Sequence, residues 1–380
     1  MRFAAFCASL ILAVPAALAG EDRRAEAVLD GLVRPDEPGL AVLVRKQGKT
    51  VFERGYGVRD LRSRERIDER TAFRLASLTK AFTATAIELL VRDGRLRYDD
   101  PLTSVLPAFP AYGRAITIRQ LLNHTSGLPD YEELMEAAEK GRAPIWTAER
   151  QIGDDEVLGL LRAEKKGRFA PGTSWACSNS GYVVLGLVAA RVSGKPFAEL
   201  LRERIFDPLR MKHTVVHEKG RSELSSRAFG HTRVEGEFRE ADQSPTSATL
   251  GDGGVYSSLE DLALWDEALA AHTLLSPSAM KPALTPARLA DGSQPRWPEG
   301  AAGGGDLEPG RPVSYGFGWF LDPWRGRPRQ WHHGVTTGFR DVIERFGDDG
   351  VTVVILSNRD DLDVRALALQ IADLYLAPAR

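Results

Sequence analysis

The sequence predicts an α+β fold, in which both ends of the chain form one antiparallel sheet flanked by helices and a helical region is inserted between them. Two observations lead to this prediction. β-branched and aromatic runs lie near both ends, at about residues 25–75 and 313–380. Between them, at about residues 76–312, apolar residues recur mainly at helical spacing. Strands that are separated from helices in this way, instead of alternating with them, are typical of α+β domains.

The first predicted strands form a hairpin near the N-terminus. Runs of β-branched and aromatic residues at 40–44 and 50–56 are separated by the polar segment Lys-Gln-Gly-Lys at 46–49. Two such runs joined by a short loop containing Gly are typical of a β-hairpin. We expect this hairpin to form one edge of the sheet.

The C-terminal part is expected to supply the other strands and a closing helix. Strand-like runs occur at 315–321, 329–333, 342–346 and 351–356, with a Gly-Asp-Asp-Gly turn at 347–350 and a helical pattern at about 363–376. In the inserted region, helical spacing is found at 118–122, 157–161, 182–192 and 197–205. Residues 297–312 are rich in Gly and Pro and predict a surface loop, for which a plain linker is the favoured interpretation because composition alone indicates no chemistry.

The N-terminus has the layout of a cleavable secretory signal. Arg2 is followed by an apolar run and then by Ala-Leu-Ala at 17–19, which predicts cleavage after Ala19 and a mature domain of residues 20–380. A membrane anchor is the alternative, but the run is shorter than the roughly 20 residues that a spanning helix needs. We therefore expect a periplasmic or secreted protein without a stable membrane span.

Composition excludes several other classes of protein. The formal charge of −2 becomes −3 when the single cation Arg2 is lost, so no nucleic-acid partner is expected. Of the 2 cysteines, Cys7 would leave with the signal, and Cys177 alone cannot form an internal disulfide. His213 and His217 are four residues apart, but no carboxylate or Cys set completes a zinc site, so no metal is expected.

Ser77 and Lys80 form the first candidate for chemistry. The run that follows Ser77 has helical spacing and stops at Asp93-Gly94, so Ser77 is expected at a helix start, where unpaired N–H groups and the helix dipole favour an oxyanion. Three-residue spacing puts Lys80 on the same face, where its amine can accept the hydroxyl proton. The alternative is an ordinary N-cap serine with a solvated lysine, since Ser-x-x-Lys also occurs by chance.

Further segments in the same order resemble the serine β-lactamase and penicillin-binding superfamily, specifically its class C β-lactamase-like branch of esterases and DD-peptidases. The segment Pro-Gly-Thr-Ser-Trp-Ala-Cys-Ser-Asn at 171–179 resembles the second family motif, Tyr-x-Asn. His-His-Gly at 332–334 resembles the third, in its His-x-Gly form. Supporting matches lie at 121–131, 253–262 and 315–319. The resemblance implies a β-lactamase/DD-peptidase-like fold for almost the whole chain.

The resemblance also implies roles for residues beyond Ser77 and Lys80. Asn179 would hold the lysine and the substrate, and His332 would donate to a substrate carbonyl or carboxylate, with the adjacent His333 as the alternative. Gly334 would let the strand lie close to the ligand. The backbone N–H groups of Ser77 and Val335 would form the oxyanion hole. His124, by contrast, is expected to pack a loop.

Cys177 departs from the family pattern, because it occupies the position of the motif tyrosine, whose phenol shuttles protons. A thiol is more acidic than a phenol but shorter, and it is only a weak donor. The following Tyr182 is expected to be buried and a poor substitute. Cys177 as nucleophile is disfavoured, since it does not lie at a helix start in this register.

The function expected from these residues is hydrolysis of an ester or amide through an acyl-enzyme on Ser77, of the esterase, DD-peptidase or β-lactamase type, with no cofactor. The partner would be a small molecule or peptide with an ester, amide or β-lactam carbonyl. The alternative is an impaired penicillin-binding or ligand-sensing protein, because Cys177 replaces the motif tyrosine.

Overall fold

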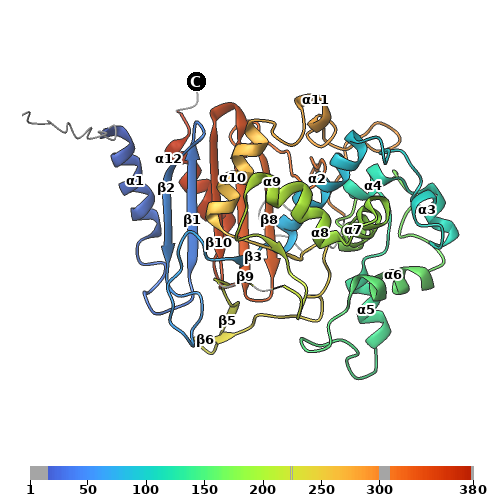
Figure 1. Cartoon of the computed structure of the whole chain (residues 1–380), viewed down its shortest axis with the longest axis horizontal. Coiled ribbons are helices and arrows are strands. Elements are labelled where there is room, and N and C mark those ends of the chain that lie inside the picture. Colours follow the sequence, from blue (N-terminus) through green and yellow to red (C-terminus); the bar gives the residue numbers. More distant parts are fainter. Residues whose placement is uncertain (1–15, 223, 225, 299–308, 378–380) are drawn as a thin grey trace, which may run out of the picture.

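The computed structural model describes residues 16–222, 224, 226–298 and 309–377, and its main element is a five-stranded antiparallel sheet. The sheet has the order β2-β1-β10-β9-β8, so strands from the two ends of the chain lie side by side (Figure 1). Its strands are β1 (Leu40–Lys46), β2 (Lys49–Tyr56), β8 (Gln330–Thr336), β9 (Phe339–Phe346) and β10 (Val351–Ser357). The predicted sheet, built from both termini with the hairpin at one edge, is confirmed.

Both faces of the sheet are buried, because successive side chains of its central strands point to opposite sides. In β1, Val42 and Val44 pack toward the helices α1 (Ala16–Leu29) and α12 (Val364–Tyr375). Ala41 and Leu43 instead join the large core on the other face, which contains the inserted region. Helix α10 (Leu259–Ala270) contacts this second face. The sheet is thus the middle layer between two sets of helices.

Two long helices organise the inserted region. Helix α2 (Thr79–Arg92) is buried from Thr79 to Leu90 and packs against α7 (Asn179–Ser193). The shorter helices around them are α3 (Leu102–Val105), α4 (Ile118–Leu122), α5 (Tyr131–Glu139), α6 (Asp154–Ala163), α8 (Phe197–Leu201), α9 (Asp207–Leu209) and α11 (Pro277–Met280). In Figure 1 this helical part lies to the right of the sheet. The helices predicted at 118–122, 157–161, 182–192 and 197–205 are confirmed, the last continuing as a π-helical turn at Arg202–Phe206.

Two expectations about the strands were wrong. The inserted region is not all helical: its strands β4 (Val215–Val216) and β7 (Val255–Ser257) form a small sheet with β3 (Phe73–Arg74), which lies just before the region, and β5 (His231–Val234) and β6 (Glu237–Glu240) form a hairpin. Residues 315–321 form a tight turn instead of a strand, with Gly316 N–H donating to Trp319 O at 2.9 Å. Gly318 explains the turn, since its φ is +74° and a Cβ there would lie 2.8 Å from Lys80 O. The glycine therefore allows this turn to pack closely against α2.

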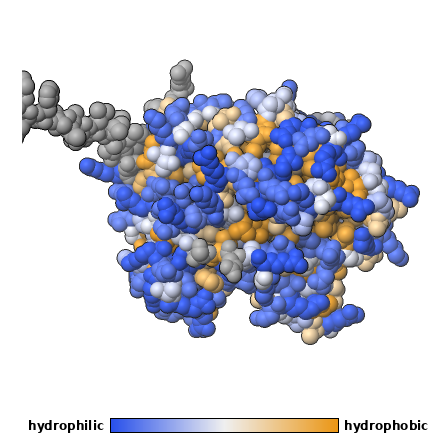
Figure 2. All heavy atoms as spheres, in the orientation of Figure 1, coloured by the Kyte–Doolittle hydropathy of each residue, from blue (hydrophilic) through white to orange (hydrophobic). Residues whose placement is uncertain are grey.

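The described surface is mainly hydrophilic on the face seen in Figure 2. Within the described ranges, no helix has the length and apolar content needed to cross a membrane. Residues 1–15, which carry most of the predicted signal, and residues 299–308 of the predicted loop lie outside the description. The flanks of that loop are joined, because Gly310 N–H donates to Trp297 O at 2.9 Å.

Candidate active site

Ser77 lies in a short 3₁₀ turn, Ala76–Leu78, that leads directly into α2. The residue before it, Ala76, has a φ of +45°, in the left-handed region that non-glycine residues rarely adopt. Neither the turn nor α2 is capped by a side chain, so Ser77 is not an N-cap serine. The hydroxyl of Ser77 is therefore available for another partner at the helix start, as predicted.

That partner is Lys80. Its Nζ donates to Ser77 Oγ at 2.8 Å, to Asn179 Oδ1 at 2.9 Å and to the backbone oxygen of Asp252 at 3.3 Å. The lysine side chain is only 1% exposed, and no carboxylate forms an ion pair with it in the described part of the chain. The three predicted residues Ser77, Lys80 and Asn179 are thus brought together, whereas no pattern in the sequence pointed to the Asp252 carbonyl.

Asn179 is held at the first position of α7. Ser178 caps this helix by accepting from Gly181 N–H at 3.2 Å, and Asn179 N–H donates to Asp130 Oδ2 at 2.8 Å. Asp130 is buried and in turn caps α5, where it accepts from Glu132 N–H at 3.1 Å. One carboxylate therefore joins the starts of two helices and fixes the asparagine beside Lys80.

Cys177 lies just before the cap of α7 and its side chain reaches solvent. Protein packed around the thiol on its other sides desolvates it, which raises its pKa, although nearby Lys80 acts in the opposite direction. Tyr182 cannot replace the missing phenol, because it is fully buried and its hydroxyl donates to Leu122 O at 2.7 Å. The position of the motif tyrosine is thus accessible and lacks an aromatic hydroxyl.

His124 supports the loop that carries Cys177. Its carbonyl accepts from Ala176 N–H at 3.1 Å, and its Nδ1 accepts from Ser178 N–H at 3.2 Å. The ring packs against Tyr182 and Tyr315, with centroid distances of 5.2 and 4.7 Å. Burial lowers the pKa of His124 well below its ordinary value, so the ring is neutral. The expected packing role of His124 is confirmed.

The ring of His332 contacts other groups of the protein, whereas the sequence predicts that it donates to substrate. The side chain is 4% exposed, and its Nδ1 lies 2.8 Å from His333 O, so Nδ1–H is the donor. Burial, followed by the neighbouring His333 and Lys80, lowers the pKa of His332 well below its ordinary value. The neutral ring then accepts at Nε2 from the Tyr315 hydroxyl at 3.1 Å. Both ring nitrogens are engaged within the protein, while the alternative, His333, is partly exposed.

The backbone of β8 approaches Ser77 closely, and β8 is an edge strand of the sheet. Trp331 N–H donates across the outer edge to Phe320 O at 3.0 Å. Because N–H directions alternate along a strand, Val335 N–H points to the same outer edge. This direction is consistent with the predicted oxyanion hole, which remains a prediction.

Gly334 is required for packing. A Cβ at this position would lie 2.1 Å from Leu75 O and 3.3 Å from Asp341 Oδ2, so its missing side chain allows β8 to lie against the turn that carries Ser77. The structure thus explains why residue 334 is a glycine by its packing against this turn, which the sequence did not suggest. The contact of Gly334 with substrate remains a prediction.

Replacing Gly334 with alanine is expected to destabilise the protein by about 3 kcal/mol, because the clash is with backbone that cannot rotate away. We also expect kcat/KM to fall about 100-fold, since Ser77 and Val335 N–H would be moved apart. Thermal unfolding and hydrolysis assays measure both effects. Gly347→Ala is the matched control, because a Cβ there meets nothing within 4 Å. Wild-type stability and activity in Gly334→Ala would contradict the prediction.

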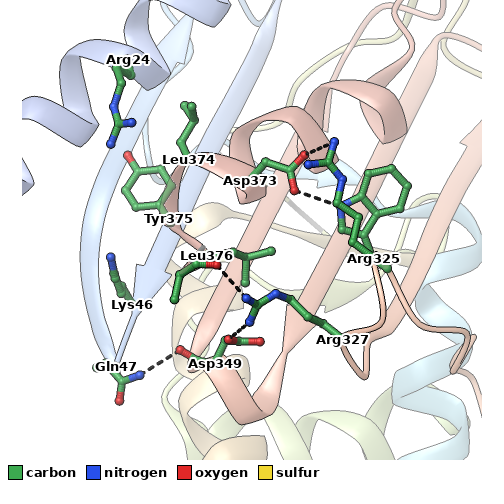
Figure 3. Close-up of a pocket in the computed structure, with 12 residues that line it drawn as sticks. Arg24, Lys46, Gln47, Arg325, Arg327, Asp349, Asp373, Leu374, Tyr375 and Leu376 are labelled. Atoms are coloured by element: carbon green, nitrogen blue, oxygen red, sulfur yellow. Dashed lines mark hydrogen bonds and ion pairs between the residues drawn. The ribbon is translucent and has the colours of Figure 1, made fainter. Parts of the chain in front are cut away.

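A cavity beside the main sheet lies away from these residues. It has a volume of about 680 Å³ and is lined by 12 residues, among them Arg24, Lys46 and Tyr375 (Figure 3). Arg325 and Asp373 form an ion pair at 3.1 Å on one side of it. In the described ranges, no group of three or more His, Cys, Asp and Glu residues is arranged to hold a metal ion.

The sheet, the helical region and the Ser-Lys-Asn arrangement at their junction are those expected of the serine β-lactamase and penicillin-binding class of proteins. The chain belongs to the β-lactamase family, whose model matches residues 25–376. It is 30% identical over 334 residues to penicillin-binding protein 4* of Bacillus subtilis (strain 168), covering 84% of this chain and 68% of that protein. It is 28% identical over 346 residues to a D-aminopeptidase of Gluconobacter oxydans (strain 621H), covering 88% of this chain and 58% of that protein.

A solved structure extends the similarity to the fold. The octameric penicillin-binding protein homologue from Pyrococcus abyssi has a TM-score of 0.75 at 25% identity, covering 91% of this chain and 75% of that chain. The predicted superfamily and fold are confirmed. The chain spans little more than half the length of the D-aminopeptidase.

Proposed function

We propose that the protein is a serine hydrolase that cleaves an ester or amide through an acyl-enzyme on Ser77. The observation that carries this proposal is Lys80 Nζ, 2.8 Å from Ser77 Oγ and held in place by Asn179. In the uncharged form, the Lys80 amine accepts the hydroxyl proton as Ser77 Oγ bonds to the carbonyl carbon, which reverses the direction of their hydrogen bond. The N–H groups of Ser77 and Val335 stabilise the oxyanion. The leaving group departs with the proton that Lys80 took from Ser77, and water then attacks the acyl carbon, so that the acid is released and a proton returns to Ser77 Oγ.

Among substrates we place esters and simple amides first, D-amino-acid peptides second and β-lactams third. The His-x-Gly form of the third motif supports this order, and the D-aminopeptidase relative supports the second class. We propose a periplasmic or secreted location on the basis of the predicted signal at residues 1–19.

Covalent labelling tests this function. Purified protein is incubated with a fluorophosphonate or a labelled penicillin, and the Ser77 peptide is examined by mass spectrometry. We expect an adduct with at least one reagent, and none in Ser77→Ala. A folded wild-type sample that gives no adduct with either reagent would overturn the proposal.

Cys177 favours a second candidate, a penicillin-binding or ligand-sensing protein without efficient turnover. Its thiol replaces the hydroxyl expected to carry protons to and from the leaving group. The two candidates differ in the lifetime of the adduct. Release of the acyl group of an activated ester from Ser77 within minutes indicates a hydrolase, whereas acyl adducts that persist for hours with both the ester and the penicillin indicate the sensor.

A further inference from the structure

Glu132, in the first turn of α5, contacts the candidate active site. Asp130 caps α5 through Glu132 N–H and also accepts from Asn179 N–H, so the start of α5 is fixed beside the start of α7. As a result, Glu132 Oε1 accepts from Asn179 Nδ2 at 3.3 Å. The position of Glu132 is therefore set by the same carboxylate that positions Asn179.

The contact extends the network of the nucleophile to the protein surface. Lys80 Nζ donates to Ser77 Oγ and to Asn179 Oδ1, and the amide of Asn179 donates from its other end to Glu132. Only one asparagine side chain separates the glutamate from the lysine. The side chain of Glu132 reaches solvent, and in the described part of the chain its Oε2 has no hydrogen-bond partner. A carboxylate oxygen is thus presented at the mouth of the site.

The surroundings of Glu132 are anionic. Asp130 and Asp252 lie close enough to act on it electrostatically, and Asp252 has one buried carboxylate oxygen without a partner among the described residues. Glu133, the next residue, is paired with Arg168 at 3.2 Å. Lys80 also acts on Glu132 electrostatically, but its amine is already hydrogen-bonded to Ser77. The free carboxylate oxygen of Glu132 therefore has no cationic partner among the described residues.

We propose that Glu132 is a specificity-determining residue that binds a protonated amine of the substrate close to the scissile carbonyl. This inference rests on the proposed acyl-enzyme on Ser77 and names a substrate class for it: acyl donors with a free amino group. A carboxylate and an ammonium group form a charge-assisted hydrogen bond, which an acylated, uncharged amine cannot replace. An anionic group at the same place is repelled by Glu132 and Asp130.

The pH dependence of amine binding follows from the charges around the carboxyl group of Glu132. Desolvation, followed by Asp130 and Asp252, raises the pKa of Glu132 to about 7, with Lys80 and the Asn179 hydrogen bond acting in the opposite direction. Below that pH the carboxyl is neutral and attracts the amine weakly. An α-amino group loses its own proton near pH 8. We therefore expect kcat/KM for amine substrates to be greatest between about pH 7 and 8.

Protection from labelling tests the proposal without requiring turnover. Wild-type protein and Glu132→Gln are labelled at Ser77 with a fluorophosphonate in the presence of D-alaninamide or N-acetyl-D-alaninamide. Glutamine is chosen because its oxygen can still accept from Asn179 Nδ2, so that the network is kept. Glu133→Gln is the matched control, since it removes a neighbouring charge that is paired with Arg168.

We expect D-alaninamide to protect the wild type at a concentration at least about tenfold lower than the acetylated compound does. Glu132→Gln should remove this preference and leave protection by N-acetyl-D-alaninamide unchanged, and Glu133→Gln should behave as the wild type. Equal protection of the wild type by both compounds, or an equal loss for both in Glu132→Gln, overturns the proposal. The labelled penicillin replaces the fluorophosphonate if it alone labels Ser77, and a folded wild type that neither reagent labels overturns the proposed function itself, and the inference with it.

Discussion

Replacing Lys80 with methionine is expected to lower kcat/KM about 10⁴-fold, because its amine is the side-chain group described within hydrogen-bond distance of Ser77 Oγ and, when uncharged, can take the hydroxyl proton. Methionine has a similar volume, so the packing around α2 is largely kept. It leaves Asn179 Oδ1 and Asp252 O without their donor, and both the position of the asparagine and the reactivity of the serine should suffer. Initial rates on an activated ester measure the loss.

The controls separate this effect from a general loss of folding. Lys195→Met removes a lysine that lies just beyond the C-terminal end of α7 and is paired on the surface with Glu199 at 3.5 Å, so it should keep wild-type rates. Circular dichroism checks that Lys80→Met is folded. A folded Lys80→Met protein with more than a tenth of the wild-type kcat/KM would mean that another group accepts the proton from Ser77.

The sequence was sufficient to predict the main sheet because its strands carry their own local signal. Runs such as 40–44 and 351–356 are apolar apart from Thr352, as expected for strands that are buried on both faces, and their turns contain Gly. The small sheet was not predicted, because strands of two or three residues have no measurable periodicity. Phe73 and Arg74 are extended only because they pair with Ser257 and Tyr256, far along the chain.

The candidate site was predicted in part. Motif order was enough to expect Ser77, Lys80 and Asn179 together, and the hydrogen bonds of Lys80 confirm this grouping. The contacts of His332 could not be foreseen, since they depend on Tyr315 entering from a turn whose sequence looked like a strand. Glu132 was missed because its neighbour Asn179 is distant in sequence, and only the shared Asp130 brings the two together.

Cys177→Tyr is expected to raise turnover of amide substrates about 100-fold, because a phenol restores the proton transfer to the leaving group that general acid catalysis supplies. The position can accept a ring, since the cysteine side chain reaches solvent. Activated esters should gain little, because their leaving groups depart without a proton. Steady-state rates on a matched p-nitroanilide and p-nitrophenyl ester of the same acyl group measure the difference.

Cys177→Ser distinguishes the effect of adding a phenol from the effect of removing the thiol. Desolvation by the protein packed on one side of Cys177 raises its pKa, so at neutral pH the thiol stays protonated and is a weak donor. Serine has similar length and does not ionise, and it should therefore change neither substrate's rate by more than about twofold. Suppose instead that Cys177→Tyr leaves amide turnover unchanged or lowers it, while Ser77 is still labelled. The substrate then occupies the open space at Cys177, and catalysis at this site does not require a phenol.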